Sequence, residues 1–290
     1  MLNKKKYFHN NSNSFLKIKG TDCLKFLQGL ISNDIYITNR NRGIYSSLLS
    51  PQGKFMYDFF LVKFKDSILL ECNKEIIEEL KIKLNLYKLR SNVEILEDKN
   101  MNSYLLQKNI KSKLNHINSL EIVYFDDPRF LNSNIKFYCS QNEFNKINKD
   151  LLLKPAEKKE FENLRINNIV PDFFLDTKKN ESLLLELRFD DLNGINWKKG
   201  CYIGQELTAI TKYRANIKKK LFGLKISGYI DEIEKKVFFE KKEIGLITSY
   251  NQNFGIAILK IKEVELSLKE SIPLTSGNAI LSPFIPSWVR

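Results

Sequence analysis

The nine residues from Lys198 to Glu206 form the densest group of chemically active side chains in the sequence. Within six of them, Cys201 to Glu206, lie a thiol, a phenol, an amide and a carboxylate, which supply hydrogen-bond donors and acceptors of several kinds. Gly200 and Gly204 predict tight turns or a close approach of the backbone to another group. The alternative interpretation is a turn into the apolar residues that follow, with Cys201 as a small buried side chain.

Few other residues could bind a metal or act as a nucleophile. The four cysteines stand at positions 23, 72, 139 and 201, with no closely spaced pair. This spacing does not indicate a zinc site, although four thiols would be enough for one. Disulfides are not expected in a chain of this length without a secretion signal. His9 and His116 are the only histidines, which argues against a histidine metal site and a Ser-His-Asp triad.

The composition indicates a folded protein with an excess of positive charge. Hydrophobic residues make up 43% and aromatic residues 12% of the 290 residues, which is enough for two or three packed domains. Lysine and arginine exceed aspartate and glutamate by 47 − 34 = 13. The lysines are spread along the whole chain without an arginine-rich stripe. RNA binding is therefore the weaker interpretation of the charge, and an anionic ligand is compatible with it.

The N-terminal residues predict a cytoplasmic protein. The lysines at 4–6 are not followed by the apolar stretch of a secretory signal, and the segment lacks the arginine-rich character of a transit peptide. No run approaches the roughly 18 apolar residues of a membrane helix. We also expect a monomer, because the apolar positions are accounted for by the predicted cores.

Strands and helices alternate from the start of the chain. Residues 14–19 alternate in polarity as a strand does. Thr21-Asp22 offers helix N-caps, and apolar residues at helical spacing follow. Asn33 and Asp34 then break the pattern, either as a helix cap and turn or as a polar pair directed at a ligand.

A hairpin and a larger mixed region follow. The turn Ser50–Lys54, which contains a proline and a glycine, separates two predicted strands over residues 43–62. Asn73 is placed to cap the next helix, which has an apolar stripe. Further alternation of strands and helices up to residue 154 fits an α+β domain.

The segment before Lys198 contains a predicted helix and an acidic residue in apolar surroundings. The helix spans residues 157–168, includes Phe161 and Arg165, and is ended by Pro171. Glu186 stands inside the apolar run 183–187, where a buried carboxylate would need a partner.

The sequence changes character near residue 216. Short strand-like segments separated by Gly, Asn and Pro fill residues 217–290 and predict a small antiparallel barrel or sandwich. We therefore expect an α+β region over residues 1–216, built from two interleaved subdomains, and a β-barrel domain over residues 217–290.

Several of these stretches resemble one family, the YgfZ-type folate-binding proteins. These proteins assist assembly or repair of iron–sulfur clusters and are relatives of the glycine-cleavage T-protein, an aminomethyltransferase. The resemblance covers nearly the whole chain, in order. It rests on Lys199–Glu206, which is similar to the family signature, and on Phe26–Asp34, Ser50–Lys54 followed by Asp58, Arg165 with Pro171, and Gly245–Ser249.

The resemblance implies an α+β, T-protein-like fold with a split N-terminal region, a ferredoxin-like middle part and a C-terminal antiparallel β-barrel. It also implies that tetrahydrofolate, or a one-carbon derivative of it, lies in a central channel. Glu186 would accept hydrogen bonds from the pterin, and Phe161 would stack on a ring of the ligand. The implied folate-binding residues are Asn33, Asp34, Phe161, Glu186, Lys199, Tyr202 and Arg214, with Lys199 and Arg214 meeting the glutamyl carboxylates.

The resemblance further implies an accessory protein whose partners are iron–sulfur client or assembly proteins. Cys201 is the candidate functional thiol, and Lys198 and Lys199 would favour its thiolate. No resident metal is implied, because a stable cluster usually needs several thiolates. The alternative is a folate-dependent aminomethyltransferase or methyltransferase, against which the Cys201 signature argues. Ile210 and Ala215 stand where the family usually has an arginine and a glycine.

Overall fold

The chain divides into two compact units that are interleaved in sequence. The computed structural model describes residues 5–117, 119–130, 133–214, 217–230 and 235–289. The boundary predicted at residue 216 lies outside these ranges and stays a prediction. The first unit comprises Met1–Leu49, Met56–Phe161 and Asn193–Ile203, and the second comprises Ser50–Phe55, Glu162–Leu192 and Gly204–Arg290.

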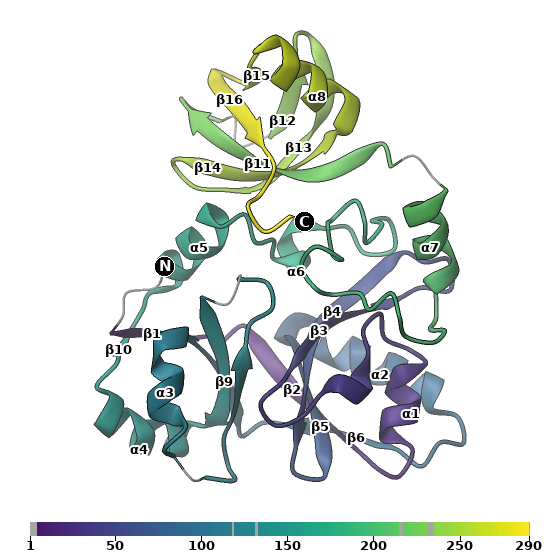
Figure 1. Cartoon of the computed structure of the whole chain (residues 1–290), viewed down its shortest axis with the longest axis vertical. Coiled ribbons are helices and arrows are strands. Elements are labelled where there is room, and N and C mark those ends of the chain that lie inside the picture. Colours follow the sequence, from purple (N-terminus) through teal and green to yellow (C-terminus); the bar gives the residue numbers. More distant parts are fainter. Residues whose placement is uncertain (1–4, 118, 131–132, 215–216, 231–234, 290) are drawn as a thin grey trace. The chain divides into compact units, whose positions relative to one another are not determined.

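The first unit is built on two five-stranded sheets (Figure 1). Their strands are β1 (Lys6–His9), β2 (Asn13–Lys19), β3 (Ile44–Leu49), β4 (Phe55–Phe64), β5 (Ser67–Asn73), β6 (Glu94–Asp98), β7 (Met101–Gln107), β8 (Val123–Asp126), β9 (Asn134–Ser140) and β10 (Lys154–Pro155). One sheet has the order β3-β4-β5-β2-β6 and the other has the order β10-β1-β7-β9-β8. The strands predicted at 14–19 and in the hairpin are confirmed.

Helices bury one face of each sheet. The apolar sides of α1 (Cys23–Gln28) and α2 (Ile77–Lys88) share a core with the β3-β4-β5-β2-β6 sheet. Asn73 caps the start of this helical segment by accepting from the Glu75 N–H at 2.9 Å, as predicted. Asp22 is the N-cap residue of α1, but its carboxylate accepts from the Asn92 N–H at 2.7 Å instead of from the helix. The second sheet packs with α3 (Lys111–Leu114) and α4 (Gln141–Leu151).

The second unit contains a closed six-stranded barrel with the order β11-β14-β13-β12-β15-β16. Its strands are β11 (Lys219–Ser227), β12 (Lys236–Phe239), β13 (Lys242–Tyr250), β14 (Phe254–Lys260), β15 (Leu274–Ser276) and β16 (Ala279–Phe284). The sequence did not predict α8 (Ile261–Glu270), which buries Val264 in the barrel core. The barrel itself is confirmed.

Three further helices lie near the candidate functional residues. The helix predicted over 157–168 is observed as α5 (Lys158–Asn167), and α6 (Phe173–Asp176) follows it. The apolar segment after the signature forms α7 (Gln205–Tyr213), which the sequence did not predict as a helix. Gly204 is its N-cap with φ +77°, a conformation that favours glycine. Within the described ranges, no helix is both long enough and apolar enough to cross a membrane.

Candidate functional site

Residues 193–203 lie against the turn that follows α1. The Ser32 hydroxyl donates to the Gly194 carbonyl at 2.7 Å. The Ile203 N–H donates to the Gly29 carbonyl at 3.2 Å. The start of the family-like signature is therefore a neighbour of the family-like turn after the first helix, although about 170 residues separate them in sequence.

Lys199 holds these two segments together through its ammonium group. Its Nζ donates to the carbonyls of Gln28 at 2.8 Å, Asn33 at 2.9 Å and Ile31. These acceptors lie at and beyond the C-terminal end of α1, where carbonyls lack helical partners and a cation is favoured. An ammonium has three N–H donors, and these contacts use all of them. This geometry differs from the predicted contact of Lys199 with glutamyl carboxylates.

The Lys199 side chain is buried, and burial changes its acid–base properties. Only 9% of the residue is exposed. Burial lowers the pKa of Lys199 from 10.5 to about 8, while the carboxylate of Asp34 acts in the opposite direction. The ring of the buried Tyr202 lies 4.9 Å from Nζ, a cation–π distance. Lys199 and Tyr202 therefore support the loop from inside.

Asn33 and Asp34 serve the turn rather than an open site. The Asn33 amide donates to the carbonyls of Tyr45 and Asn193, both at 2.8 Å, and accepts from the Asp34 N–H. The Asp34 carboxylate accepts from the Tyr36 N–H and from the Gln28 side chain, both at 3.0 Å. Of the two interpretations given by the sequence, the cap and turn is the one observed.

Cys201 is the exposed thiol of this loop. The other three cysteines, Cys23, Cys72 and Cys139, are buried. Burial raises the pKa of Cys23 to about 11 and raises the pKa values of Cys72 and Cys139 as well. Lys199 points its ammonium at carbonyls, so of the two flanking lysines only Lys198 is exposed. Among the described residues, no group of three or more His, Cys, Asp or Glu is arranged to hold a metal ion.

Two other predicted residues lie outside this loop. The Phe161 ring stacks on Phe8 of β1, with centroids 4.3 Å apart and planes 1° from parallel. One face of Phe161 is therefore covered by the protein. Arg214 is exposed at the end of α7, and the Ala215 departure from the family pattern lies outside the described residues.

Glu186 lines a cavity of about 430 Å³ in the second unit. One wall is the segment from Leu175 to Glu186, and the other is formed by β11, β13 and β14. The Glu186 carboxylate is half-buried and accepts from the Leu183 N–H at 3.4 Å. Its main-chain carbonyl accepts from Leu221 of β11 at 2.8 Å. The cavity is lined by Leu175, Asp176, Thr177, Lys178, Glu181, Ser182, Glu186, Lys219, Glu243, Ile244, Gly245, Leu246, Thr248, Ile258 and Lys260.

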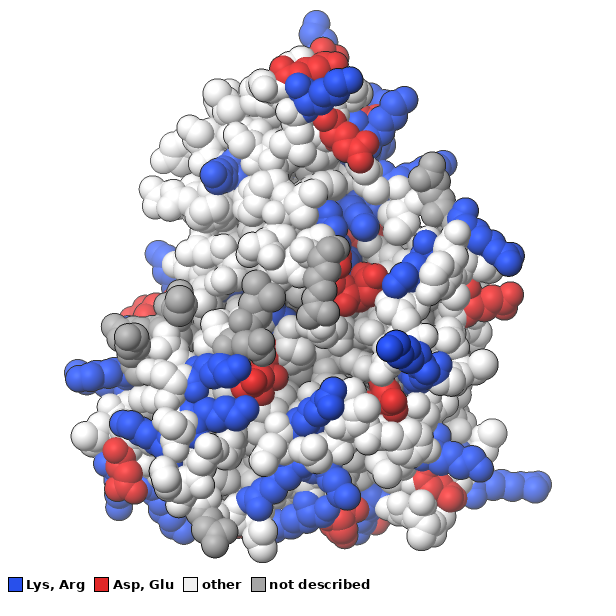
Figure 2. Space-filling model, in the orientation of Figure 1, with Lys and Arg blue, Asp and Glu red and all other residues white. Residues whose placement is uncertain are grey.

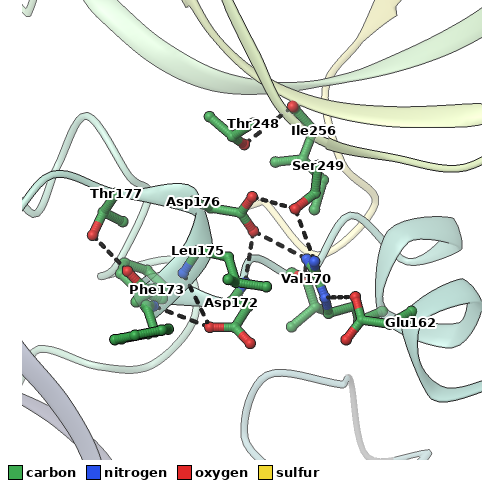
Figure 3. Close-up of polar contacts among 12 residues, drawn as sticks. Glu162, Val170, Asp172, Phe173, Leu175, Asp176, Thr177, Thr248, Ser249 and Ile256 are labelled. Carbon is green, nitrogen blue, oxygen red and sulfur yellow. Dashed lines mark hydrogen bonds and ion pairs between the residues drawn. The ribbon is translucent and has the colours of Figure 1, made fainter. Parts of the chain in front are cut away.

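A buried ion-pair network fixes the cavity wall on the barrel (Figure 3). The Arg165 guanidinium donates to Asp176 of α6 at 3.0 Å and to Ser249 of β13 at 2.8 Å. Ser249 also donates to Asp176, and Figure 3 shows these two side chains pointing toward one another. Glu162 accepts from the third side of the guanidinium at 2.8 Å. The resulting wall is held by charge-assisted hydrogen bonds rather than by apolar packing alone.

The barrel strand adapts locally to this network. The pairing of β13 with β14 shifts between Ile247 and Ser249, which indicates a β-bulge at Thr248. Thr248 and Ser249 are next to one another in sequence; Thr248 lines the cavity and Ser249 bonds to Arg165. Burial raises the pKa of Asp176 although Arg165 beside it acts in the opposite direction.

A third polar group, in the first unit, was not predicted as a site. Arg129 donates to both carboxylate oxygens of Asp127, at 3.1 and 2.9 Å, and its guanidinium carbon lies 4.6 Å from the Phe60 ring centroid. The Tyr45 hydroxyl donates to Asp58 at 2.7 Å. In the sequence, Asp58 enters only through the family resemblance. The charged residues Asp127 and Arg129 are the signal in the sequence that could have indicated this group.

The predicted site residues therefore fall into separate groups. Asn33, Asp34, Lys199, Cys201 and Tyr202 lie together on the loop and turn of the first unit. Phe161 packs on β1. Glu186 and Arg214 belong to the second unit.

Comparison with known proteins confirms the resemblance that the sequence suggested. The family described as "CAF17, C-terminal beta-barrel domain" matches residues 218–290. The mitochondrial iron-sulfur cluster assembly factor IBA57 homolog of Dictyostelium discoideum is 26% identical over 250 residues, which cover 74% of this chain and 61% of that protein. The chain thus spans less than two thirds of that relative's length. The tRNA-modifying protein YgfZ of Hamiltonella defensa is 26% identical over 234 residues, which cover 74% of this chain and 68% of that protein.

The fold is shared with a solved structure. Aminomethyltransferase T of the glycine cleavage system from Bartonella henselae superposes with a TM-score of 0.76, covering 95% of this chain and 83% of that one, at 11% identity. This likeness concerns the fold alone. Together with the C-terminal barrel, it confirms the α+β, T-protein-like architecture predicted from the sequence.

Proposed function

We propose that the chain is an accessory protein that supports assembly or repair of iron–sulfur proteins, with Cys201 as its functional thiol. The observation that carries this proposal is the contrast among the four cysteines: Cys201 is exposed on a loop fixed by Lys199, while the other three are buried. An exposed thiol on a fixed loop is suited to transient contact with a cluster or with a partner protein. The relatives named as iron-sulfur cluster assembly factors support the proposal.

The thiol is tested by replacing it in cells that lack the protein. We expect Cys201→Ser to leave the protein folded and to abolish its support of iron–sulfur enzyme activity. Lys25→Ala is the control, because this lysine is exposed on α1 of the same unit and does not belong to the loop. Full rescue by Cys201→Ser would remove the thiol from the mechanism.

We propose that the ligand is tetrahydrofolate or a one-carbon derivative, with its pterin at Glu186. The Glu186 carboxylate accepts only one long hydrogen bond from the described residues, which leaves acceptor capacity for the pterin. A cavity of about 430 Å³ with apolar residues in its walls has room for such a ligand. Asn33, Asp34, Tyr202 and Lys199 would then act by shaping the loop of the first unit.

Anaerobic calorimetric titration with tetrahydrofolate tests this assignment. We expect one-site binding that Glu186→Gln weakens about tenfold or more, because unpaired pterin donors cost about 1–3 kcal/mol. Glu181→Gln is the control. Glu181 lines the same cavity, but its carboxylate already has a cation beside it, because the Lys178 Nζ lies 3.8 Å from its Oε2. Cys201→Ala should bind normally. Equal losses for the Glu186 and Cys201 variants would contradict the division of roles. Turnover with glycine-derived amine donors would instead identify a transferase.

We propose a cytoplasmic monomer that acts on protein partners and needs neither a membrane nor a specific nucleic acid. Figure 2 shows Lys and Arg interspersed with Asp and Glu over the visible face rather than gathered over one element. The Dictyostelium relative is named as mitochondrial and the Hamiltonella relative as tRNA-modifying. Three measurements test these points separately. Localisation of a tagged chain tests the compartment, light scattering tests the oligomeric state, and RNA binding measured against salt concentration tests the nucleic-acid part.

A further inference from the structure

Two lysines face one another on the barrel wall of the Glu186 cavity. Lys219 of β11 and Lys260 of β14 are direct cross-strand partners in the antiparallel pairing, and both line the cavity. The Cβ atoms of such partners lie about 4.5–5.5 Å apart, and like charges placed in this way destabilise a sheet. The pair therefore opposes folding unless something neutralises it.

No carboxylate of the described residues lies within ion-pair distance of either lysine. Within the part of the chain that the structure describes, Lys260 Nζ donates to the main-chain carbonyl of Glu243 at 3.1 Å, and neither lysine forms an ion pair. The Glu243 carboxylate lies 3.9 Å from a different lysine, Lys236. On the opposite wall, Lys178 is 3.8 Å from Glu181. The positive charge of Lys219 and Lys260 thus remains available to a ligand.

The rest of the cavity defines the kind of ligand that would use this charge. Glu186 offers a carboxylate acceptor, and its main-chain carbonyl is bonded to Leu221, two residues from Lys219 on β11. Leu246 and Ile258 add apolar surface to the same cavity. A matching ligand has a hydrogen-bond donor group, an apolar body and a separate anionic group.

We propose that Lys219 and Lys260 form a carboxylate-binding subsite that selects ligands with an anionic tail. This proposal rests on the proposed folate function and deepens it: the glutamyl carboxylates would be met by these two lysines instead of by Lys199, whose donors are all used within the protein. An anion between the two ammonium groups would also relieve their mutual repulsion.

The experiment compares two ligands that differ in the tail. The unmodified chain and the Lys219→Gln/Lys260→Gln double variant are titrated anaerobically with tetrahydrofolate and with 6-methyltetrahydropterin, which has the reduced pterin but no carboxylate. We expect the double variant to lose about tenfold or more in affinity for tetrahydrofolate, as the loss of charge-assisted hydrogen bonds predicts, and to bind the pterin unchanged. Lys225→Gln is the control, because Lys225 is an exposed lysine of β11 that does not line the cavity.

Each outcome decides between the two proposals. Loss confined to tetrahydrofolate, with a weaker salt dependence in the double variant, supports the subsite. Equal affinities of the unmodified chain and the double variant for tetrahydrofolate overturn the subsite and leave folate binding intact. An equal loss for both ligands shows a general disturbance of the cavity and also overturns it. If the unmodified chain binds neither ligand, the folate assignment fails, and the subsite fails with it.

Discussion

The first unit buries the ammonium of Lys199 against three carbonyls, whereas the second unit leaves the ammonium groups of Lys219 and Lys260 on the wall of a cavity. Lys199 has no remaining donor, and its environment is the protein itself. The other two lysines oppose one another across a strand pair and form no ion pair among the described residues. The same residue type thus has a structural role in one place and free binding capacity in the other.

The difference lies in burial and in the number of donors already used. A buried cation whose donors are satisfied contributes to folding, because its removal leaves buried acceptors without partners. A cation beside a cavity contributes little to folding, and its removal changes ligand binding. We therefore expect substitutions of these cations to separate into effects on stability and effects on affinity.

The largest expected effect tests whether burial, rather than the unit in which a cation lies, determines its contribution to stability. Arg165 is a buried cation of the second unit. Arg165→Met should lower the free energy of unfolding by about 3–5 kcal/mol, because it leaves the buried carboxylate of Asp176 without its cation. Chemical denaturation monitored by circular dichroism gives the value. Glu162→Gln is the control: it removes the more exposed end of the same network and should cost below about 1 kcal/mol. A loss of less than 1 kcal/mol in the free energy of unfolding for Arg165→Met would contradict the expectation, based on Lys199, that a buried and fully bonded cation stabilises the fold.

Removing Lys199 itself should have the next largest effect. Lys199→Met deprives the carbonyls of Gln28, Ile31 and Asn33 of their donor and should cost about 2–4 kcal/mol of stability. Lys198→Met, an exposed neighbour, should change stability by less than about 0.5 kcal/mol. As a second measurement, amide hydrogen exchange of residues 200–203 should be faster in Lys199→Met only, because that variant frees the loop. Equal stabilities of the two variants would show that the loop needs no internal cation.

The pH dependence of that difference sharpens the comparison. The pKa of Lys199 falls from 10.5 to about 8 on folding, so between these values the unfolded chain binds more protons than the folded one. Stability attributable to Lys199 therefore rises with pH over this window, by at most about 1.4 kcal/mol per pH unit. The free energies of unfolding of the unmodified chain and of Lys199→Met are measured in pairs at matched salt between pH 7.5 and 10. The difference between them should widen as the pH rises. A gap that narrows would mean that the three carbonyls favour the charged form more strongly than burial opposes it.

The sequence predicted the fold well where local patterns and family resemblance agreed. The strand at 14–19, the Asn73 cap and the C-terminal barrel all follow from alternation, capping chemistry and turn residues. The helix α8 was missed because Val264 to Leu268 alternate in polarity as a strand does. Asp22 is the N-cap residue of α1, but its side chain forms no cap hydrogen bond, because the distant main-chain N–H of Asn92 donates to its carboxylate.

The site was less predictable, because its partners are set by tertiary contacts. Nothing local in Lys-Lys-Gly-Cys distinguishes Lys198, which is exposed, from Lys199, which reaches carbonyls about 170 residues away in sequence. Asn33 and Asp34 likewise have side chains of types that often bind ligands. Their hydrogen bonds are made instead with the main-chain groups of Tyr45, Asn193 and Tyr36. The pairing of Lys219 with Lys260 depends on a strand register that sequence patterns do not specify.

The smallest expected effect concerns that lysine pair, and its direction is informative. Without ligand, Lys219→Gln or Lys260→Gln should leave stability unchanged or raise it by up to about 0.5 kcal/mol, because each removes one of two opposed like charges. The gain should disappear at high salt, where the repulsion is screened. Thermal denaturation of both single variants and of Lys225→Gln, at low and high salt, provides the measurement. If either cavity lysine instead cost more than 1 kcal/mol, it would be satisfied within the protein as Lys199 is, and the charge offered to an anionic ligand would not exist.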